Sequence, residues 1–228
     1  MQVGLIGIGR MGKALIPGLA EQFELWIYDR DPANMETVAE KYPVFIAKDL
    51  AQIAESGVVI LVVPDREVVS CLKELNQIKK PVVVINAATN VARYTLQEMA
   101  AGHVKCIGAK FVGQAGEIVL GQKPVIIIDD QPADLVPLVK EIFAGIGPIV
   151  VGKADMVTYI NTVAAEAVLE AAVRMEESLR YRGITEPVVI QTAIRQVGAG
   201  ILKAYADNDL GPFAREIVRA IRARINKW

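Results

Sequence analysis

Residues 4–12 read GLIGIGRMG and place three glycines, Gly7, Gly9 and Gly12, directly after an apolar run. Gln2–Ile6 is rich in strand-forming residues, and residues 11–20 then change to apolar positions four apart, which is typical of a helix. The glycines therefore lie where a strand gives way to a helix. At such a junction the first glycine permits a tight turn. The second lets a ligand approach the backbone, and the third lets the helix pack against its strand.

An acidic residue, Asp29, follows the glycines at the end of the next strand-like run. A second strand-like run, Glu24–Tyr28, ends at Asp29, which is 22 positions after Gly7. In a dinucleotide-binding fold, a carboxylate near this position accepts hydrogen bonds from the adenosine ribose, and the first N–H groups of the helix bind the pyrophosphate. The order of strand, glycines, helix, strand and acid therefore predicts such a domain. The alternative is a glycine turn in an unrelated α/β protein, with Asp29 capping the next helix.

Strand-like and helix-like segments continue to alternate for about 150 residues. The apolar runs Gly57–Val63 and Pro81–Ile85 are typical of strands that are buried on both faces. This alternation predicts an α/β fold with a doubly wound, mostly parallel sheet of Rossmann type. Ligands of such sheets bind beyond the carboxyl ends of the strands. We therefore expect the cofactor to contact a set of strand-end residues: Gly7, Ile8, Gly9, Arg10, Met11, Gly12, Asp29, Arg30, Val63, Pro64, Asn86, Ala87 and Ala88.

The residues around Asp29 and Asn86 bear on which dinucleotide binds and how. A carboxylate at Asp29 repels a 2′-phosphate, which favours NAD over NADP, whereas Arg30 would engage that phosphate if Asp29 turned away. The small residues Ala87 and Ala88 leave room for a nicotinamide ring. Asn86 also fits a turn that ends a strand, and Asp65 fits the cap of the following helix.

After Gly152 the strand-like runs stop. Residues 155–182 form a long helical stretch, and further helices fit Val188–Ala206 and Pro212–Ile225. The sequence therefore predicts a dinucleotide-binding domain at residues 1–152 and a small all-helical domain at residues 153–228. Three helices bury little apolar surface for an independent core, and the long helix is apolar around much of its circumference. We therefore expect the helical domain to form a homodimer.

Composition excludes some classes of partner. The 25 basic and 26 acidic residues nearly balance, which provides no footprint for nucleic acid or an anionic membrane. Cys71 and Cys106 lack metal-ligand spacing and suit a reducing compartment. We detect no signal peptide and no apolar run that approaches a membrane span, and we expect a cytoplasmic protein with a small-molecule substrate and no metal.

Residues 4–19, GLIGIGRMGKALIPGL, resemble the opening of the pyrroline-5-carboxylate reductases. Their superfamily includes the 3-hydroxyacid dehydrogenases and the deazaflavin (F420)-dependent NADP oxidoreductases. Residues 62–64 and 84–91 (VINAATNV) resemble the reductases' strand-end segment and small-residue loop, and residues 183–203 resemble their dimerising helices. The resemblance implies a nicotinamide dinucleotide, hydride transfer to or from C=N or C=O, and a dimer built by the helical part.

The chain departs from both families at the expected catalytic positions. The reductases begin their long helix with a serine–glycine-rich segment, where this chain has Ile160–Ala165 (INTVAA), and their proline–glycine–glycine–threonine–threonine loop has no counterpart. The helix threonine that the reductases use falls near Gln196. In the dehydrogenases a lysine lies three residues before an asparagine. Asn161 matches the asparagine, but Thr158 occupies the lysine position.

Candidate catalytic groups therefore come from the start of the long helix. Tyr159 is a candidate proton donor, Asn161 a candidate to orient a carbonyl, and Thr158 lies beside them; a helix cap with dimer packing is the alternative for each. His103, at the far end of its strand, is expected to be an exposed turn residue. Lys110, at the carboxyl end of the same strand, either faces substrate or is an exposed strand-end lysine, and we favour the latter.

Three functions remain open from the sequence. The first is an NAD(P)-dependent reductase or dehydrogenase that acts on a small imine or carbonyl compound. The second is a deazaflavin–NADP oxidoreductase, in which the partner of the nicotinamide is another cofactor. The third is a dinucleotide-binding or sensing protein without catalysis, which would explain the missing catalytic residues.

Overall fold

The computed structural model describes residues 1–225 and divides into two compact units, residues 1–162 and a helical unit that begins at Val163. The predicted domain boundary after residue 152 lies ten residues before the end of the first unit, which includes the first two turns of the long helix. Residues 226–228 of the predicted helical domain lie outside the described part.

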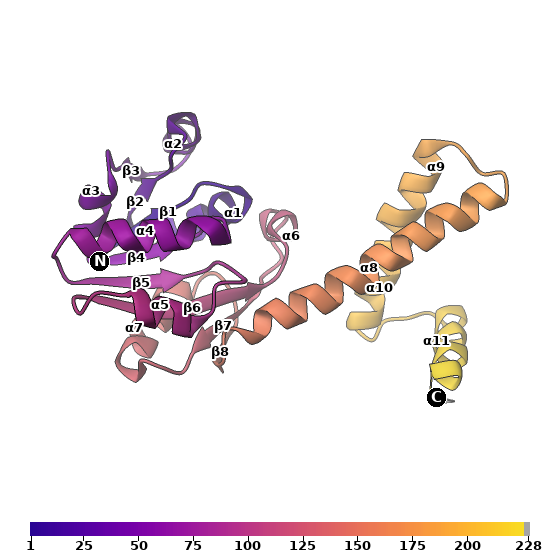
Figure 1. Ribbon diagram of the computed structural model, residues 1–228. Helices are drawn as coiled ribbons and strands as arrows, with labels where there is room; N and C mark the ends of the chain where they lie inside the picture. Colours follow the sequence, from indigo (N-terminus) through magenta and orange to yellow (C-terminus); the bar gives the residue numbers. More distant parts are fainter. Residues whose placement is uncertain (226–228) are drawn as a thin grey trace. The chain divides into compact units, whose positions relative to one another are not determined.

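One sheet organises the first unit (Figure 1). Its eight strands are β1 (Gln2–Ile6), β2 (Glu24–Tyr28), β3 (Val44–Ile46), β4 (Val58–Leu61), β5 (Val82–Asn86), β6 (Val104–Val112), β7 (Val125–Asp129) and β8 (Ile149–Gly152). Their spatial order is β3-β2-β1-β4-β5-β6-β7-β8, and every neighbouring pair is parallel except β6 with β7. The predicted doubly wound, mostly parallel sheet is confirmed. Strand order reverses between β1 and β4, the place where such sheets bind ligands.

Helices cover both faces of this sheet (Figure 1). One face carries α1 (Arg10–Ala20), α2 (Pro32–Ala39) and α7 (Val136–Phe143), and the other carries α3 (Leu50–Ala54), α4 (Asp65–Gln77) and α5 (Arg93–Met99). The short helix α6 (Ala115–Val119) follows β6, and a 3₁₀ turn, η1 (Ala133–Leu135), leads into α7.

The strands are apolar on both faces because each face has its own core. In β4, Val58 and Ile60 pack on the side of α1, whereas Val59 and Leu61 pack on the side of α4. This alternation follows from the two-residue period of a strand. Burying each such side chain contributes about 1.5–3 kcal/mol, so the sheet is a rigid base for the loops at its ends.

The helical unit continues α8 (Met156–Tyr181), whose first residues belong to the first unit. Three consecutive segments then form one helical stretch: α9 (Pro187–Thr192), a π-helical segment η2 (Ala193–Gly198) and α10 (Ala199–Ala206). α11 (Pro212–Ile225) follows. Gly183, with φ of +81°, lies just after α8 as the predicted stop.

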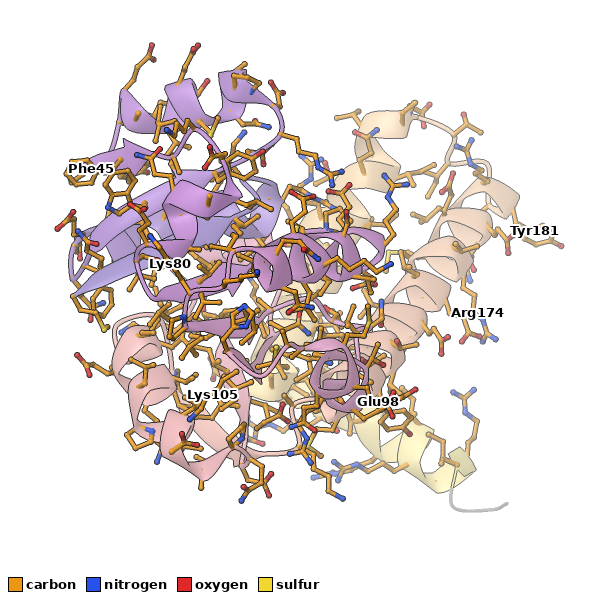
Figure 2. All side chains as sticks on the ribbon, turned by 60° about the vertical axis from the view of Figure 1, so that its left-hand side comes forward. Phe45, Lys80, Glu98, Lys105, Arg174 and Tyr181 are labelled. Carbon is orange, nitrogen blue, oxygen red and sulfur yellow. The ribbon has the colours of Figure 1, made fainter. Side chains whose placement is uncertain are left out.

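Large apolar side chains of the helical unit are mostly exposed. Within the described part of this unit, only Ile190 is a buried apolar residue. Polar side chains share this surface: Arg174 forms an ion pair with Glu170 at 2.5 Å, and Arg174 and Tyr181 project outward from α8 (Figure 2). The exposed apolar residues are Val163, Val168, Leu169, Val173, Tyr181, Val188, Val189, Val197, Ile201, Leu202, Tyr205, Phe213, Ile217, Ile221 and Ile225.

By length and composition alone, α8 could cross a membrane. The expectation that no apolar run approaches a membrane span is therefore wrong for this helix. The sequence prediction missed it because Glu166 and Glu170 interrupt the apolar run. The mean hydropathy within the 26-residue helix is nevertheless high enough for a membrane span.

Candidate functional site

The three glycines after β1 have three different surroundings. Gly7 has φ of +102°, and a Cβ there would overlap the carbonyl oxygen of Val62, so only glycine fits this turn. A Cβ on Gly12 would overlap the carbonyl oxygen of Gly7, which shows how closely α1 packs on its strand. A Cβ on Gly9 would meet no atom within 4 Å. Gly9 therefore faces open space, where a ligand can contact the backbone.

Asp29 braces this glycine turn. One oxygen of its carboxylate, Oδ2, accepts a hydrogen bond from the Ile8 N–H at 2.5 Å, and the other, Oδ1, accepts one from the Asp31 N–H at 2.9 Å. The alternative in which Asp29 caps α2 is wrong, because Asp31 is the N-cap and accepts from the Ala33 N–H. Asp29 thus stays at the carboxyl end of β2, beside the glycines.

A cleft follows the carboxyl ends of the strands in the first unit and consists of two adjoining hollows. The first has a volume of about 280 Å³ and is called the ribose hollow, because Asp29, the expected ribose acceptor, lines it. The second has a volume of about 570 Å³ and is called the ring hollow, because the loop Ala87–Asn90, expected beside the nicotinamide ring, lines it. The two share Gly9, Val62, Val63 and Pro64, so one extended ligand can occupy both.

Ten of the thirteen predicted cofactor contacts line this cleft. The ribose hollow is lined by Gly7, Gly9, Asp29, Arg30, Val63 and Pro64, and the ring hollow by Gly9, Arg10, Met11, Val63, Pro64, Ala87 and Ala88. Ile8, Gly12 and Asn86 line neither hollow. Ile8 and Gly12 shape the turn, and their role is to hold its backbone in place.

The side chain of Asn86 holds the small-residue loop by hydrogen bonds to its backbone. It is 1% exposed, its Oδ1 accepts from the Ala88 N–H at 3.1 Å, and its Nδ2 donates to the Val91 carbonyl at 3.3 Å. The strand-ending turn is therefore the geometry that the structure shows. Asp65 does not cap α4 with its side chain, which instead accepts hydrogen bonds from the Asn90 N–H and Nδ2 and so links two strand-end loops.

Acidic side chains predominate around the ribose hollow. Besides Asp29 it is lined by Asp31, Glu67 and Glu74, and the single cation there, Arg30, forms an ion pair with Glu67 at 3.3 Å. Sequence reasoning missed Glu67 and Glu74, because they come from α4 and only the fold brings them to the end of β2. The hollow is therefore electrostatically unfavourable to an additional phosphate.

A cysteine also lines the ribose hollow. Burial raises the pKa of the Cys71 thiol to about 11, and Arg30 opposes only part of this rise. Burial likewise raises the pKa of the Cys106 thiol to about 12. Both thiols are therefore neutral near pH 7, and Cys71 offers the cleft an apolar contact and no nucleophile.

The three catalytic candidates have separate positions. Asn161 lines the ring hollow and donates through Nδ2 to the Phe111 carbonyl at 3.0 Å, while its Oδ1 has no hydrogen-bond partner among the described residues. Thr158 donates through Oγ1 to the Thr89 carbonyl at 2.6 Å, which fixes the loop Ala87–Asn90 to α8. Tyr159 is 74% exposed and lines neither hollow. Within the first unit, Asn161 is thus the candidate that faces the cleft.

Lys110 contradicts the sequence expectation. It is 1% exposed rather than an exposed strand-end residue, and its Nζ donates to the Val91 carbonyl at 2.9 Å and to Asp155 Oδ1 at 2.6 Å. The available signal was its place in the apolar strand VKCIGAKFV. His103 is half-buried rather than exposed, with Nε2 buried and without a hydrogen-bond partner, and it precedes β6 at the end of the strand away from the cleft.

A buried acid lies at the end of the neighbouring strand β7. Asp129, 2% exposed at the end of β7, accepts from the Gly108 N–H at 2.9 Å and the Ala154 N–H at 3.0 Å. Burial raises the pKa of the Asp129 carboxyl above its usual range, and these N–H groups and Arg93 oppose the rise. Asp129 thus holds the segment before α8 against the sheet. Among the described residues, no cluster of three His, Cys, Asp or Glu side chains could hold a metal ion.

Fold and cleft together define a Rossmann-type α/β domain with its ligand cleft at the switch between β1 and β4. Residues 2–90 match the family model described as NADP oxidoreductase, coenzyme F420-dependent, and the resemblance inferred from residues 4–19 is confirmed. Comparison with curated protein sequences finds no match.

Solved structures share the fold across nearly the whole chain. A pyrroline-5-carboxylate reductase from Coxiella burnetii aligns with a TM-score of 0.70 and 15% identity over 96% of this chain and 84% of its own. Pyrroline carboxylate reductase from Plasmodium falciparum, with NADP bound, aligns with a TM-score of 0.67 and 15% identity over 100% and 91%. An imine reductase variant from Myxococcus stipitatus, in complex with NAD⁺, aligns with a TM-score of 0.65 and 16% identity over 91% and 77%.

Proposed function

We propose that this protein is an NAD(P)-dependent oxidoreductase that transfers hydride between a nicotinamide and a small imine or carbonyl compound. The observation that carries the proposal is the continuous cleft that passes the open face of Gly9, with Asp29 at one end and the loop Ala87–Asn90 at the other. The family model and the nicotinamide-bound structures that share the fold support it.

The cleft accounts for each part of a dinucleotide. The first N–H groups of α1 have no partner within the helix, and together with the helix dipole they favour a pyrophosphate beside Gly9. The adenosine ribose then lies in the ribose hollow, where Asp29 accepts its hydroxyl hydrogens. The nicotinamide lies in the ring hollow, beside the small side chains of Ala87 and Ala88.

The charges of the ribose hollow favour NAD over NADP. The 2′-phosphate of NADP would meet four carboxylates, Asp29, Asp31, Glu67 and Glu74, while Arg30 already pairs with Glu67. Engaging Arg30 would cost that ion pair and leave Glu67 with only the more distant and more exposed Arg66, at 3.9 Å. NAD avoids this cost because its ribose carries a hydroxyl group instead.

Asp29→Ala should therefore weaken NADH binding about tenfold and raise the affinity for NADPH relative to that for NADH, since a charge-assisted hydrogen bond is lost and a repulsive carboxylate is removed. Because the same carboxylate braces the glycine turn for both cofactors, the ratio of the two dissociation constants reports the ribose contact. Calorimetric titration with each cofactor measures it. The surface variant Asp134→Ala is the matched control, and an unchanged ratio in Asp29→Ala would remove Asp29 from the ribose role.

The lining of the ring hollow favours an iminium substrate over a carbonyl. Reduction of a carbonyl needs a proton donor for the developing alkoxide, whereas hydride transfer to a protonated C=N bond yields the neutral amine directly. Among the described lining residues, the titratable ones are Arg10 and Asp65, and Asp65 is held by Asn90. The remaining polar groups are neutral, and the Asn161 Oδ1 is an acceptor for an iminium N–H.

Turnover tests this reaction directly. NADH oxidation in the presence of small cyclic imines should exceed that with keto acids or aldehydes, and Asn161→Ala should lower kcat about tenfold with little change in NADH affinity. Oxidation with carbonyl compounds only would contradict the iminium preference. Tight NADH binding without turnover of either class would favour a sensing protein.

A deazaflavin–NADP oxidoreductase is the second candidate, because the family model that matches residues 2–90 carries that description. The match covers the dinucleotide half of the cleft, which both functions share. Loss of the deazaflavin absorbance on mixing with NADPH and protein would favour this candidate over imine reduction.

We further propose that the protein is a homodimer assembled through its helical unit. A unit whose described residues include a single buried apolar side chain has too little core to be stable alone. A second copy is favoured over a membrane as the covering surface, because Glu166 and Glu170 would lie within the hydrocarbon if α8 crossed a bilayer. The buried free cysteines and balanced charge suit a cytoplasmic protein without nucleic-acid partners.

Leu169→Glu should shift the protein from dimer to monomer in light scattering at micromolar concentration, because it places a charge on a 64%-exposed apolar position of α8. Val119→Glu is the matched control, since Val119 is 70% exposed on α6 of the first unit. A wild-type monomer, or protein that partitions into lipid vesicles, would contradict the homodimer.

A further inference from the structure

A buried lysine joins three chain segments that border the ring hollow. Lys110 lies on β6, with its side chain 2% exposed, and its Nζ donates to the Val91 carbonyl and to Asp155 Oδ1. Val91 ends the loop whose residues Ala87–Asn90 line the ring hollow, and Asp155 immediately precedes α8. One ammonium group therefore connects the strand, the loop and the start of the long helix.

The partners of Lys110 are themselves held. The Val91 carbonyl also accepts from Asn86 Nδ2, and the other oxygen of Asp155, Oδ2, accepts from the Arg93 N–H at 3.2 Å. Arg93 in turn forms an ion pair with Asp130 at 3.1 Å. Lys110 is thus the buried centre of a polar network in which each partner has a second contact.

This network borders the residues that contact the ring hollow. Phe111, the next residue of β6, lines the hollow and accepts from Asn161 Nδ2 through its carbonyl. Thr158, three residues after Asp155, donates to the Thr89 carbonyl. The ammonium group therefore sets where the loop lies relative to Asn161, although Lys110 itself does not line the cleft.

We propose that Lys110, through Val91 and Asp155, is a positioning residue for the nicotinamide half of the cleft and not for the adenosine half. The proposal rests on the proposed function, because it needs a nicotinamide in the ring hollow. The ribose hollow depends on Gly7, Gly9 and Asp29, none of which contacts this network. Loss of the ammonium group should therefore affect the two halves of one dinucleotide unequally.

Lys110→Met separates the halves in a binding experiment. The variant keeps an unbranched side chain that is one atom shorter, but it leaves the Val91 carbonyl with one donor fewer and Asp155 without its cation. The dissociation constant of NADH should rise about tenfold, while that of ADP-ribose, which lacks the nicotinamide, should stay within about twofold. Calorimetry measures both, and the fluorescence of bound NADH reports the surroundings of the ring.

Lys105→Met is the matched control. Lys105 lies on the same strand, is 59% exposed and pairs with Asp134 on the surface (Figure 2). It should change neither dissociation constant. Asp155→Asn provides a second variant if Lys110→Met does not fold. Asp155 is 43% exposed, so the position tolerates a change, and the asparagine oxygen still accepts a hydrogen bond from Lys110. It should show the same selective loss with a smaller amplitude.

The outcomes distinguish the two proposals. Equal weakening of NADH and ADP-ribose, or no change in either, overturns the positioning role while leaving the dinucleotide cleft intact. Failure of the wild-type protein to bind NADH or NADPH overturns the proposed function, and the role of Lys110 with it.

Discussion

Replacing Gly9 by valine should abolish NADH binding and leave the fold intact. The Cβ position of Gly9 has no atom within 4 Å, so the new side chain extends into the open space beside the α1 N-terminus. That space is where we place the pyrophosphate, which must approach the backbone closely to accept its N–H hydrogen bonds. We expect the affinity to fall by at least about a hundredfold in a calorimetric titration.

Gly102→Val is the control for this result. Gly102 also has no atom within 4 Å of its Cβ position, and it lies in the turn before β6, at the opposite end of the sheet from the cleft. The two variants add the same side chain at positions where the Cβ meets no atom within 4 Å. Weakened NADH binding in both would indicate a general effect of the substitution and would remove Gly9 from the pyrophosphate contact.

Replacing Gly12 by alanine should have the opposite consequence and destabilise the fold. A Cβ at Gly12 would overlap the backbone carbonyl oxygen of Gly7, which a side-chain rearrangement cannot relieve. Helix α1 must move away from its strand, and we expect a loss of about 3 kcal/mol in the free energy of unfolding. Urea denaturation followed by circular dichroism measures it.

Gly102→Ala should leave the same denaturation midpoint unchanged, because its Cβ enters open space. If Gly12→Ala were equally stable, the close packing of α1 on the glycine turn would be refuted. Gly9 and Gly12 are three residues apart in one motif, but the first leaves room for a ligand and the second leaves room for the packing of α1.

The features that sequence predicted well depend on local backbone chemistry. Gly7, Gly9 and Gly12 differ in what a Cβ would meet, and the spacing of the motif already implied those differences. The buried strands were predictable because the continuous apolar run of residues 57–63 has no polar face to expose. The end of α8 was predictable because glycine readily adopts the positive φ that commonly ends a helix, and Gly183 does so.

The features that it missed depend on partners far away in the chain. Lys110 is buried only because Val91 and Asp155, which are 19 and 45 residues away, surround its ammonium group. Glu67 enters the ribose hollow because α4 begins at the strand next to β1. Asp65 departs from a capping role because Asn90 is within reach. Such contacts follow from the order of strands in the sheet, which a single sequence does not specify.

The most direct test of the dinucleotide cleft is a calorimetric titration of the wild-type protein with NADH, repeated in the presence of saturating ADP-ribose. The account predicts one binding event per chain, competition by ADP-ribose and no signal with Gly9→Val. Absence of heat with both NADH and NADPH, or binding that Gly9→Val leaves unchanged, would contradict it.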